Sequence, residues 1–277
     1  MQRATTPSAS STPSLIVRLR TVGTISLASI AVAGLFVYSL RATTNSSSAA
    51  SNVSCASRLI IVDTSSETRS PELALLTQEV VQYAAQSAVI CGTSLSAYGV
   101  DGGGQVTPII TTDDLANYTP IGPNVQIRST RFSAAEQAAL DRLVTSQLRA
   151  SYHSGDPSVT SLAALYQLGT EQSTSRTDVV MLSTGVNHDT VVDLNQPLAS
   201  GQGAILARRI SIPKIAALNL TIVGLAQVDS ALPPPSAEWP SQVLSFNLAL
   251  CRASHAAHCR LFEMASPTQV LNPRKES

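Results

Sequence analysis

The chain has 277 residues, of which 44% are hydrophobic and 13% are charged, and its formal net charge is zero. This is a globular composition slightly short of charge, and the length allows one large domain or two small ones. Four of the 18 basic residues but none of the 18 acidic residues lie before residue 42, which leaves 14 basic and 18 acidic residues, a net charge of −4, in the remainder. That balance argues against nucleic acid and anionic lipid as partners of this part.

Residues 21–40 predict a transmembrane helix. They contain no charged residue, and about 20 such residues in a helix cross the hydrocarbon core of a bilayer. Three arginines precede the segment and Arg41 alone follows it closely, so we expect a single-pass protein of the cell membrane with its N-terminus in the cytoplasm and its main part outside. A cleaved signal peptide is the alternative, because small residues at 46–51 offer a cleavage site. The apolar stretch is longer than the roughly 7–15 apolar residues in the core of an ordinary signal peptide, which favours a retained anchor.

The predicted organisation has one folded domain between polar ends. Residues 1–20 form a disordered cytoplasmic tail, 21–40 the anchor, 41–54 a linker, 55–265 the domain and 266–277 a solvated tail. Both the first tail and the linker are rich in small polar residues, which bury too little apolar surface to fold.

The run from Arg58 to Asp63 is the segment around which the domain is organised. It is short, apolar and β-branched, and a polar turn and a helix follow it, which predicts the buried first strand of a parallel α/β sheet. The turn contains Asp63, Thr64, Ser65 and Glu67. Because ligands of open α/β sheets bind outside the carboxyl ends of the strands, these four residues are ligand-binding candidates.

Strands and helices alternate along the rest of the domain. Apolar periodicity, caps and turn signals predict a loop at 111–132, helices at 71–89, 133–150, 156–169, 204–209 and 239–250, and strands at 94–100, 105–110, 177–183, 220–225 and 259–264. The glycine-rich turn at 101–104 joins two of these strands into an antiparallel hairpin. The predicted fold class is therefore α/β, a doubly wound, mainly parallel sheet with an antiparallel edge hairpin.

The cysteines predict two disulfides. Cys55, Cys91, Cys251 and Cys259 all follow the membrane segment, and an even number in an oxidising compartment indicates pairing. Cys55 comes just before the first predicted strand and Cys91 just before the second, so in a parallel pair both lie at the same edge of the sheet. This favours Cys55–Cys91 together with Cys251–Cys259 among the three possible pairings.

A zinc site is the alternative for the second pair. Cys251, His255, His258 and Cys259 share one helical face, and such a set of ligands is conceivable for zinc. In an exported protein the disulfide is the favoured interpretation.

Several motifs follow one another in the domain. A strand ends in Asp-x-Ser at 63–65, a hairpin follows, a later strand ends in Ser-Thr-Gly at 183–185, and Leu-Thr-Ile-Val-Gly-Leu at 220–225 precedes a proline-rich connector, a helix with Trp239 and a final strand. This order resembles a von Willebrand factor A domain of the membrane-anchored bacterial type. The resemblance covers about residues 55–265.

The resemblance implies a divalent-cation site, because in that family an Asp-x-Ser-x-Ser turn, a loop threonine and a later aspartate hold an ion that captures an acidic group of a partner. Asp63 and Ser65 match the first positions, and Thr130 is the candidate for the loop threonine. Glu67 replaces the second serine with a longer side chain, and Thr184 stands where the aspartate is expected. We therefore expect no metal and no other cofactor, although magnesium is the ion that such a site would take. Asp63 should then accept hydrogen bonds from its own turn.

No common catalytic motif occurs in the chain. Gly-x-Ser-x-Gly, His-Glu-x-x-His, the Walker loop and a complete Gly-x-Gly-x-x-Gly are all missing from the sequence, so we predict no catalytic residue. We expect a membrane-anchored, extracytoplasmic interaction module that binds a protein or cell-envelope ligand at the face carrying Asp63, Ser65 and Thr184. The alternatives are a cell-envelope enzyme that uses the same cleft and a structural domain with a vestigial site.

Overall fold

A computed structural model of the chain describes residues 54–65, 70–154, 161–187, 191–194, 196, 199, 201–228, 234 and 236–272. All of these residues belong to one compact unit, Asn52–Ser277. The predicted membrane segment at 21–40 lies outside the described residues. Within them, no helix combines the length and the apolar character that crossing a membrane requires.

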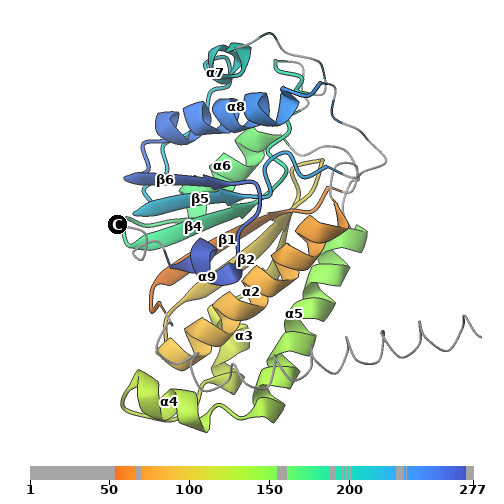
Figure 1. The fold of residues 1–277 in the computed structure, drawn as a ribbon. Coiled ribbons are helices and arrows are strands. Elements are labelled where there is room, and N and C mark those ends of the chain that lie inside the picture. Colours follow the sequence, from red (N-terminus) through yellow and green to blue (C-terminus); the bar gives the residue numbers. More distant parts are fainter. Residues whose placement is uncertain are drawn as a thin grey trace, which may run out of the picture. The chain divides into compact units, whose positions relative to one another are not determined.

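The centre of the unit is a six-stranded sheet in the order β3-β2-β1-β4-β5-β6 (Figure 1). The strands are β1 (Ser57–Asp63), β2 (Leu95–Val100), β3 (Val106–Ile110), β4 (Thr177–Leu182), β5 (Asn219–Val223) and β6 (His258–Phe262). All neighbours are parallel except β2 and β3, which are antiparallel. The prediction of a mainly parallel sheet with an antiparallel edge hairpin is confirmed. We call the side on which β1 begins the amino edge and the side on which it ends the carboxyl edge.

Helices cover both faces of this sheet (Figure 1). They are α2 (Pro71–Cys91), α3 (Thr112–Leu115), η2 (Ala116–Tyr118), α4 (Val125–Arg131), α5 (Ala134–Ser154), α6 (Leu162–Gln172), α7 (Gln202–Ala207), α8 (Trp239–Ala253) and α9 (Pro267–Leu271). Buried apolar side chains of α2, α5 and α9 form one core layer. Those of α6 and α8 form the other, so the sheet is packed on both faces as its continuous apolar strands require.

Local signals explain where α2 begins and ends. Ser70 Oγ accepts a hydrogen bond from Leu73 N at 3.1 Å, which caps the first turn. Pro71 fits the first helical position, and the Glu72 carboxylate complements the helix dipole. Gly92 ends the helix in a left-handed conformation with φ of 66°, which costs little for glycine. The apolar stripe between these ends is buried, as its helical spacing predicts.

The prediction of a loop at 111–132 is wrong, because this segment contains α3, η2 and α4. The Asn124 side chain caps α4 by accepting a hydrogen bond from Ile127 N at 2.9 Å. Arg128 of α4 donates to the carbonyl oxygens at the end of α2. These helices are short and α4 has no buried residue, so the sequence carries little periodicity from which to predict them.

The helix predicted at 156–169 differs at its end. Residues 155–160 lie outside the described part, and α6 runs from Leu162 past Gly169 to Gln172. A Cβ atom at Gly169 would lie 3.0 Å from the Ile215 side chain. This glycine therefore allows close packing and does not end the helix.

Residues 266–272 form α9 with its flanks and are not a solvated tail. Ser266 and Gln269 make a capping box at its start. Val270 and Leu271 are each 1% exposed and belong to the core layer of α2. The folded domain therefore extends beyond the predicted limit at residue 265.

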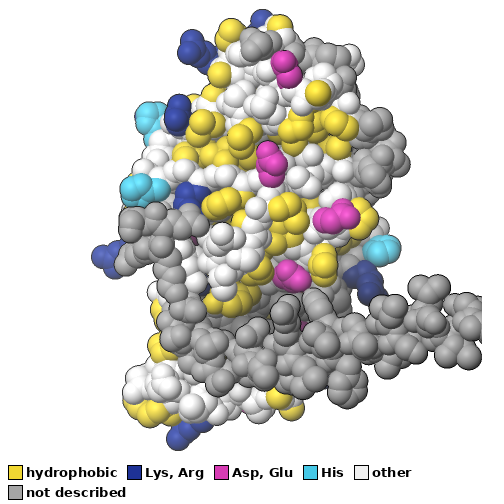
Figure 2. Space-filling view, in the orientation of Figure 1, with side chains coloured by type: hydrophobic (Ala, Val, Ile, Leu, Met, Phe, Trp, Pro, Cys, Tyr) yellow, Lys and Arg dark blue, Asp and Glu magenta, His cyan; other side chains and the backbone are white. Residues whose placement is uncertain are grey.

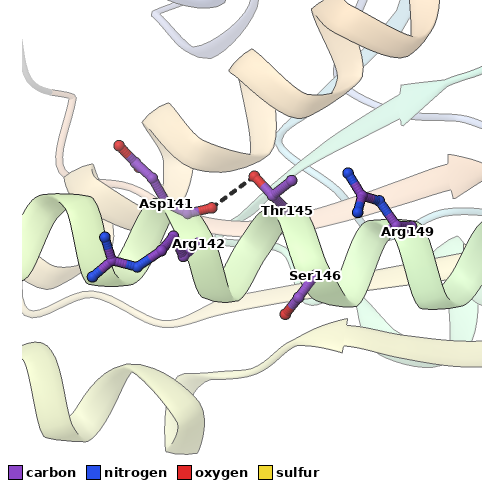
Figure 3. A pocket seen from close by; sticks show the side chains of 5 residues that line it. All are labelled: Asp141, Arg142, Thr145, Ser146 and Arg149. Atoms are coloured by element: carbon purple, nitrogen blue, oxygen red, sulfur yellow. Dashed lines mark hydrogen bonds between the residues drawn. The ribbon is translucent and has the colours of Figure 1, made fainter.

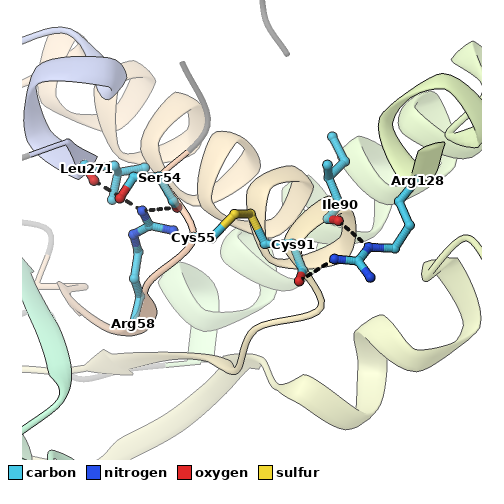
Figure 4. Close-up of a disulfide and its surroundings, with 7 residues drawn as sticks. All are labelled: Ser54, Cys55, Arg58, Ile90, Cys91, Arg128 and Leu271. Carbon is cyan, nitrogen blue, oxygen red and sulfur yellow. Dashed lines mark hydrogen bonds between the residues drawn. A yellow bond between two sulfur atoms is a disulfide. The ribbon is translucent and has the colours of Figure 1, made fainter. Parts of the chain in front are cut away.

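Both disulfides have the predicted pairing. Cys55–Cys91 has a Cα–Cα distance of 5.4 Å and Cys251–Cys259 one of 6.0 Å. The second joins α8 to β6, so its sulfurs are not free to bind zinc. The first ties the chain before β1 to the end of α2 at the amino edge, between the side chains of Arg58 and Arg128 (Figure 4).

Arg58 is a buried cation at the amino edge, with 3% of its surface exposed. It donates from Nη2 to the carbonyl oxygens of Ser54 at 2.6 Å and of Leu271 at 3.1 Å. Asp178 is its neighbour on β4 and accepts a hydrogen bond from Asn219 Nδ2 at 2.6 Å. Burial lowers the pKa of the Arg58 guanidinium, and the charge of Asp178 opposes this shift.

Candidate functional site

The order of the strands reverses between β1 and β4. From β1 the chain passes through α2 to β2 on one side, whereas β4 lies on the other side of β1. In open α/β sheets the crevice outside the carboxyl ends at such a switch point is the usual ligand site. Polar residues end both strands here, Asp63 on β1 and Ser183 directly after β4.

Asp63 joins these two strand ends through hydrogen bonds. Its Oδ1 accepts from Ser65 N at 3.1 Å and from Ser65 Oγ at 2.6 Å, and its Oδ2 accepts from Ser183 Oγ at 2.9 Å. Ser183 Oγ also accepts from Gly185 N at 3.1 Å. The expectation that Asp63 accepts bonds from its own turn is confirmed. We call Asp63, Ser65 and Ser183 the carboxyl-edge cluster.

The carboxyl-edge cluster is buried. Asp63 is 7% exposed, Ser65 2% and Ser183 1%. A carboxylate removed from water needs hydrogen-bond donors to offset its desolvation, and charge-assisted bonds are the strongest that side chains offer. The cluster can therefore fix the turn after β1 relative to the turn after β4.

Asn247 of α8 holds the turn after β4 through a hydrogen bond. Its Nδ2 donates to Gly185 O and to Val243 O, both at 2.9 Å. Asn247 is 1% exposed, and among the described residues its Oδ1 has no hydrogen-bond partner. A buried unsatisfied acceptor costs about 1–3 kcal/mol, so this asparagine is present at some cost to stability. Gly185 has φ of 66°, and a Cβ atom there would overlap Leu225.

The hairpin side of the site is closed by α5. A Cβ atom at Gly99 of β2 would collide with Ser151 Oγ of α5 and would lie 2.9 Å from the Thr64 methyl group. Asp101, also buried at 4% exposure, accepts from Gln105 N at 2.7 Å in the hairpin turn. Thr64, the predicted candidate between Asp63 and Ser65, thus packs toward β2 and α5.

The remaining predicted residues have different outcomes. Thr184 lies in the turn after β4, is 2% exposed and accepts from Val186 N at 3.3 Å. Glu67 lies outside the described residues. The assignment of Thr130 as the loop threonine is wrong, because Thr130 lies on α4 and donates to Ile127 O within that helix. Since α4 packs against α2 where that helix ends, Thr130 lies toward the amino edge.

Sequence reasoning missed Ser183 and Asn247 as members of this site. The register pairs Val62 with Leu182, so the next residues, Asp63 and Ser183, lie side by side. Aligning the ends of the two predicted strands could have found Ser183. Asn247 lies in the middle of a helix with no local signal of its role, because the contact is made only in the folded chain.

The described residues do not fit a complete divalent-cation site. Among them, no group of three or more His, Cys, Asp or Glu side chains could hold a metal ion. Asp63 is the carboxylate of the cluster, and both of its oxygens already accept hydrogen bonds. Thr184 offers a neutral hydroxyl where a second carboxylate would balance the charge of the ion.

Away from the carboxyl edge, a shallow depression lies on the surface of α5 (Figure 3). Its lining comprises Asp141, Arg142, Thr145, Ser146 and Arg149. Thr145 Oγ1 donates to the Asp141 carbonyl oxygen at 2.8 Å within the helix. The two arginine side chains start from different turns of α5 and extend in the same general direction in this view, so their guanidinium groups stay apart and do not converge on one ligand.

Comparisons of the chain with known protein families, curated proteins and solved structures return no match.

Proposed function

We propose that this protein is a membrane-anchored, extracytoplasmic interaction module with a von Willebrand A-like domain. In this proposal residues 21–40 span the cell membrane, and the domain binds a protein or cell-envelope ligand at the carboxyl edge. The turns after β1 and β4 form the centre of the binding surface. The carboxyl-edge cluster holds these turns in place, and binding requires no metal.

The observation that carries the proposal is the meeting of Asp63 with Ser65 and Ser183 at the switch point of the sheet. The strand order and the antiparallel β3 at one edge support the von Willebrand A-like assignment. The two disulfides support an oxidising compartment outside the cytoplasm.

Quantitative capture from cell-envelope extracts tests ligand binding. The full chain is immobilised as wild type, as Ser183→Ala and as Asp141→Ala, and bound components are measured by mass spectrometry. Ser183→Ala removes the hydrogen bond to Asp63 that links the turns after β1 and β4. Asp141→Ala is the control, because it removes an acidic side chain on α5, away from the carboxyl edge. We expect a component that wild type and Asp141→Ala retain equally and that Ser183→Ala loses by about tenfold, the equivalent of about 1.4 kcal/mol.

Thermal unfolding of each variant shows whether a loss of capture comes from loss of the fold. If every captured component binds Ser183→Ala as strongly as wild type while both are folded, the carboxyl edge is not the binding surface.

Reporter fusions test the anchor separately. An enzyme that is active only outside the cytoplasm, fused after residue 54, should be active, because the arginine asymmetry orients the segment. Activity of a cytoplasm-specific reporter at the same position would contradict the proposed topology.

A further inference from the structure

Cationic side chains gather along one flank of the folded unit. In Figure 2 the Lys, Arg and His side chains follow the left margin from the region of α7 past that of β6, and none of the described Asp or Glu side chains is visible there. The sequence explains this distribution, because residues 194–228 and 239–262 contain no acidic residue. These stretches include α7, β5, α8 and β6. We define the basic flank as Arg208, Arg209, Lys214 and Arg252.

The two parts of the basic flank lie side by side. Ile215 N donates to Ser254 O at 2.9 Å, which joins the segment after α7 to the turn after α8. The disulfide between α8 and β6 closes that turn. Lys214 and Arg252 therefore extend from adjacent and fixed stretches of backbone.

The cations of the basic flank take no part in holding the fold. All four are exposed, and within the described part of the chain their side chains form no hydrogen bond or ion pair. By contrast, Arg58, Arg128 and Arg260 each donate to backbone carbonyl oxygens. Clustered cations without partners repel one another, and their potential attracts an anionic surface.

Exposed apolar side chains lie among these cations. Ile205 of α7 is 58% exposed, and Ile210 and Ile212 are half-buried. The stretch 205–214 thus contains three isoleucines and three basic residues. Basic side chains beside exposed apolar ones are typical of segments that bind at a membrane interface, where phosphates meet acyl chains.

We propose that the basic flank docks on an anionic phospholipid surface. Arg208, Arg209 and Lys214 bind headgroup phosphates, and Ile205 reaches the boundary of the acyl chains. This inference goes beyond the proposed function, which concerns the carboxyl edge, and it does not require a ligand there. The net charge of −4 after residue 41 argued against such a partner, but surface charges act over a Debye length of about 10 Å, so the local cations decide.

Acidic groups of neighbouring elements bear on the basic flank. Glu238 directly before α8 and Glu263 directly after β6 are both exposed. Glu171 of α6 is exposed and accepts from Gln167 Nε2 at 2.6 Å. Asp178 of β4 is 7% exposed and accepts from Asn219 at 2.6 Å. Since Asp178 is buried, the exposed carboxylates of Glu171, Glu238 and Glu263 are the ones whose charges offset the flank in solvent.

Hydrogen exchange of the full chain in lipid nanodiscs tests the docking. Backbone amides of 205–217 are followed in discs of phosphatidylcholine alone and of phosphatidylcholine mixed with phosphatidylglycerol. We expect slower exchange in the anionic discs, reversed by high salt. Each Lys or Arg at an anionic surface contributes about fivefold to binding, so Arg208→Ser with Arg209→Ser should lower the docking constant on the order of thirtyfold.

A matched pair of arginines provides the control. Arg142→Ser with Arg149→Ser removes two exposed arginines from α5 and should leave the protection of 205–217 unchanged. Arg252→Ser alone should lower the docking constant about fivefold. Thermal unfolding of each variant confirms that the fold is kept.

Three results would overturn the inference: equal exchange in both kinds of disc, equal loss in the control pair, or the same protection in phosphatidylcholine discs with added glycerol phosphate or polyphosphate. The last would assign the flank to a soluble phosphate ligand. Recovery of the chain in phosphatidylcholine discs tests the proposed anchor independently. A failure of the anchor can therefore be distinguished from a failure of the basic flank to dock.

Discussion

The amino edge and the carboxyl edge of the sheet are held by different kinds of interaction. At the amino edge, the Cys55–Cys91 disulfide ties β1 to α2, and the buried guanidinium of Arg58 binds carbonyl oxygens of segments far apart in the chain. At the carboxyl edge, the described residues contain no disulfide, and Asp63 joins two turns through the hydroxyls of Ser65 and Ser183.

The contrast indicates that the amino edge is the more firmly held of the two and that the carboxyl edge can change its conformation. A covalent link and a long buried cation restrain the amino edge over many residues. Short polar side chains hold the carboxyl edge: Asp63 joins the turns after β1 and β4, and Asn247 bonds to the second turn from α8. Because hydrogen bonds and not a disulfide join these turns, we expect the carboxyl edge to open locally at a lower free energy than the amino edge, as suits a part of the molecule that accommodates a ligand.

Removing the disulfide at the amino edge should have the largest effect. Cys55→Ser with Cys91→Ser opens a sequence separation of 36 residues, for which the loop-entropy model gives about 4 kcal/mol of unfolding free energy. Urea unfolding of the full chain, followed by Trp239 fluorescence and circular dichroism, measures the loss. The pair Cys251→Ser and Cys259→Ser, with a separation of 8, should lose about 2.5 kcal/mol. A reversed order would show that the restraint of β1 is not the main one.

Arg58→Met should have the next largest effect. The substitution keeps most of the side-chain volume but leaves the Leu271 carbonyl and the Asp178 carboxylate without their cation, and hydrogen bonds to charged groups contribute about 1.5–3 kcal/mol. We expect the free energy of unfolding to fall by about 2–3 kcal/mol in urea titrations. Arg176→Met is the control, because Arg176 is exposed and should change stability by less than about 0.5 kcal/mol.

Ser183→Ala should cost less, about 1–2 kcal/mol, because it removes one bond to Asp63 and the acceptor of Gly185 N. Asp63→Asn should be milder still, since an asparagine oxygen can accept the two bonds from Ser65. Urea titrations measure both. A loss as large as that of Arg58→Met would mean that the carboxyl edge is as firmly held as the amino edge.

Ser133→Ala sets the scale for a local, solvent-exposed contact. Ser133 and Glu136 form the capping box of α5, and losing such a cap costs about 1 kcal/mol. The bonds from Ser133 lower the pKa of Glu136, so this carboxylate stabilises the folded state above its unfolded pKa and loses that effect as pH falls through its folded pKa. The difference in stability between wild type and Ser133→Ala should therefore shrink in acid. A constant difference would separate the cap from the charge.

The sequence predicted those parts of the fold that depend on local pattern. β1 and β4 are continuous apolar runs, and the Ser70-Pro71 start of α2 is an ordinary helix cap, so periodicity and caps located them. The same cap signal at Ser266 does not by itself predict a helix, because only five helical residues follow it. Burial of Val270 depends on α2, which no local pattern reports.

At the site, the sequence located the strand ends but not the contacts between them. Asp63 and Ser65 are near in the chain, and their bond is local. The choice of Ser183 over Thr184 depends on the register of β1 with β4. Asn247 reaches Gly185 across 62 positions of the chain. Such contacts follow from packing and not from a motif.

Native-state hydrogen exchange of the full chain tests the contrast between the edges most directly. The amides of Arg58 and Gly92 at the amino edge bond to backbone oxygens, whereas those of Ser65, Gly185 and Val186 bond to side chains of the turns. We predict that the amino-edge amides exchange only through global unfolding and that the three carboxyl-edge amides exchange through local opening with a smaller free energy. Equal opening free energies at the two edges, or a more stable carboxyl edge, would contradict the account.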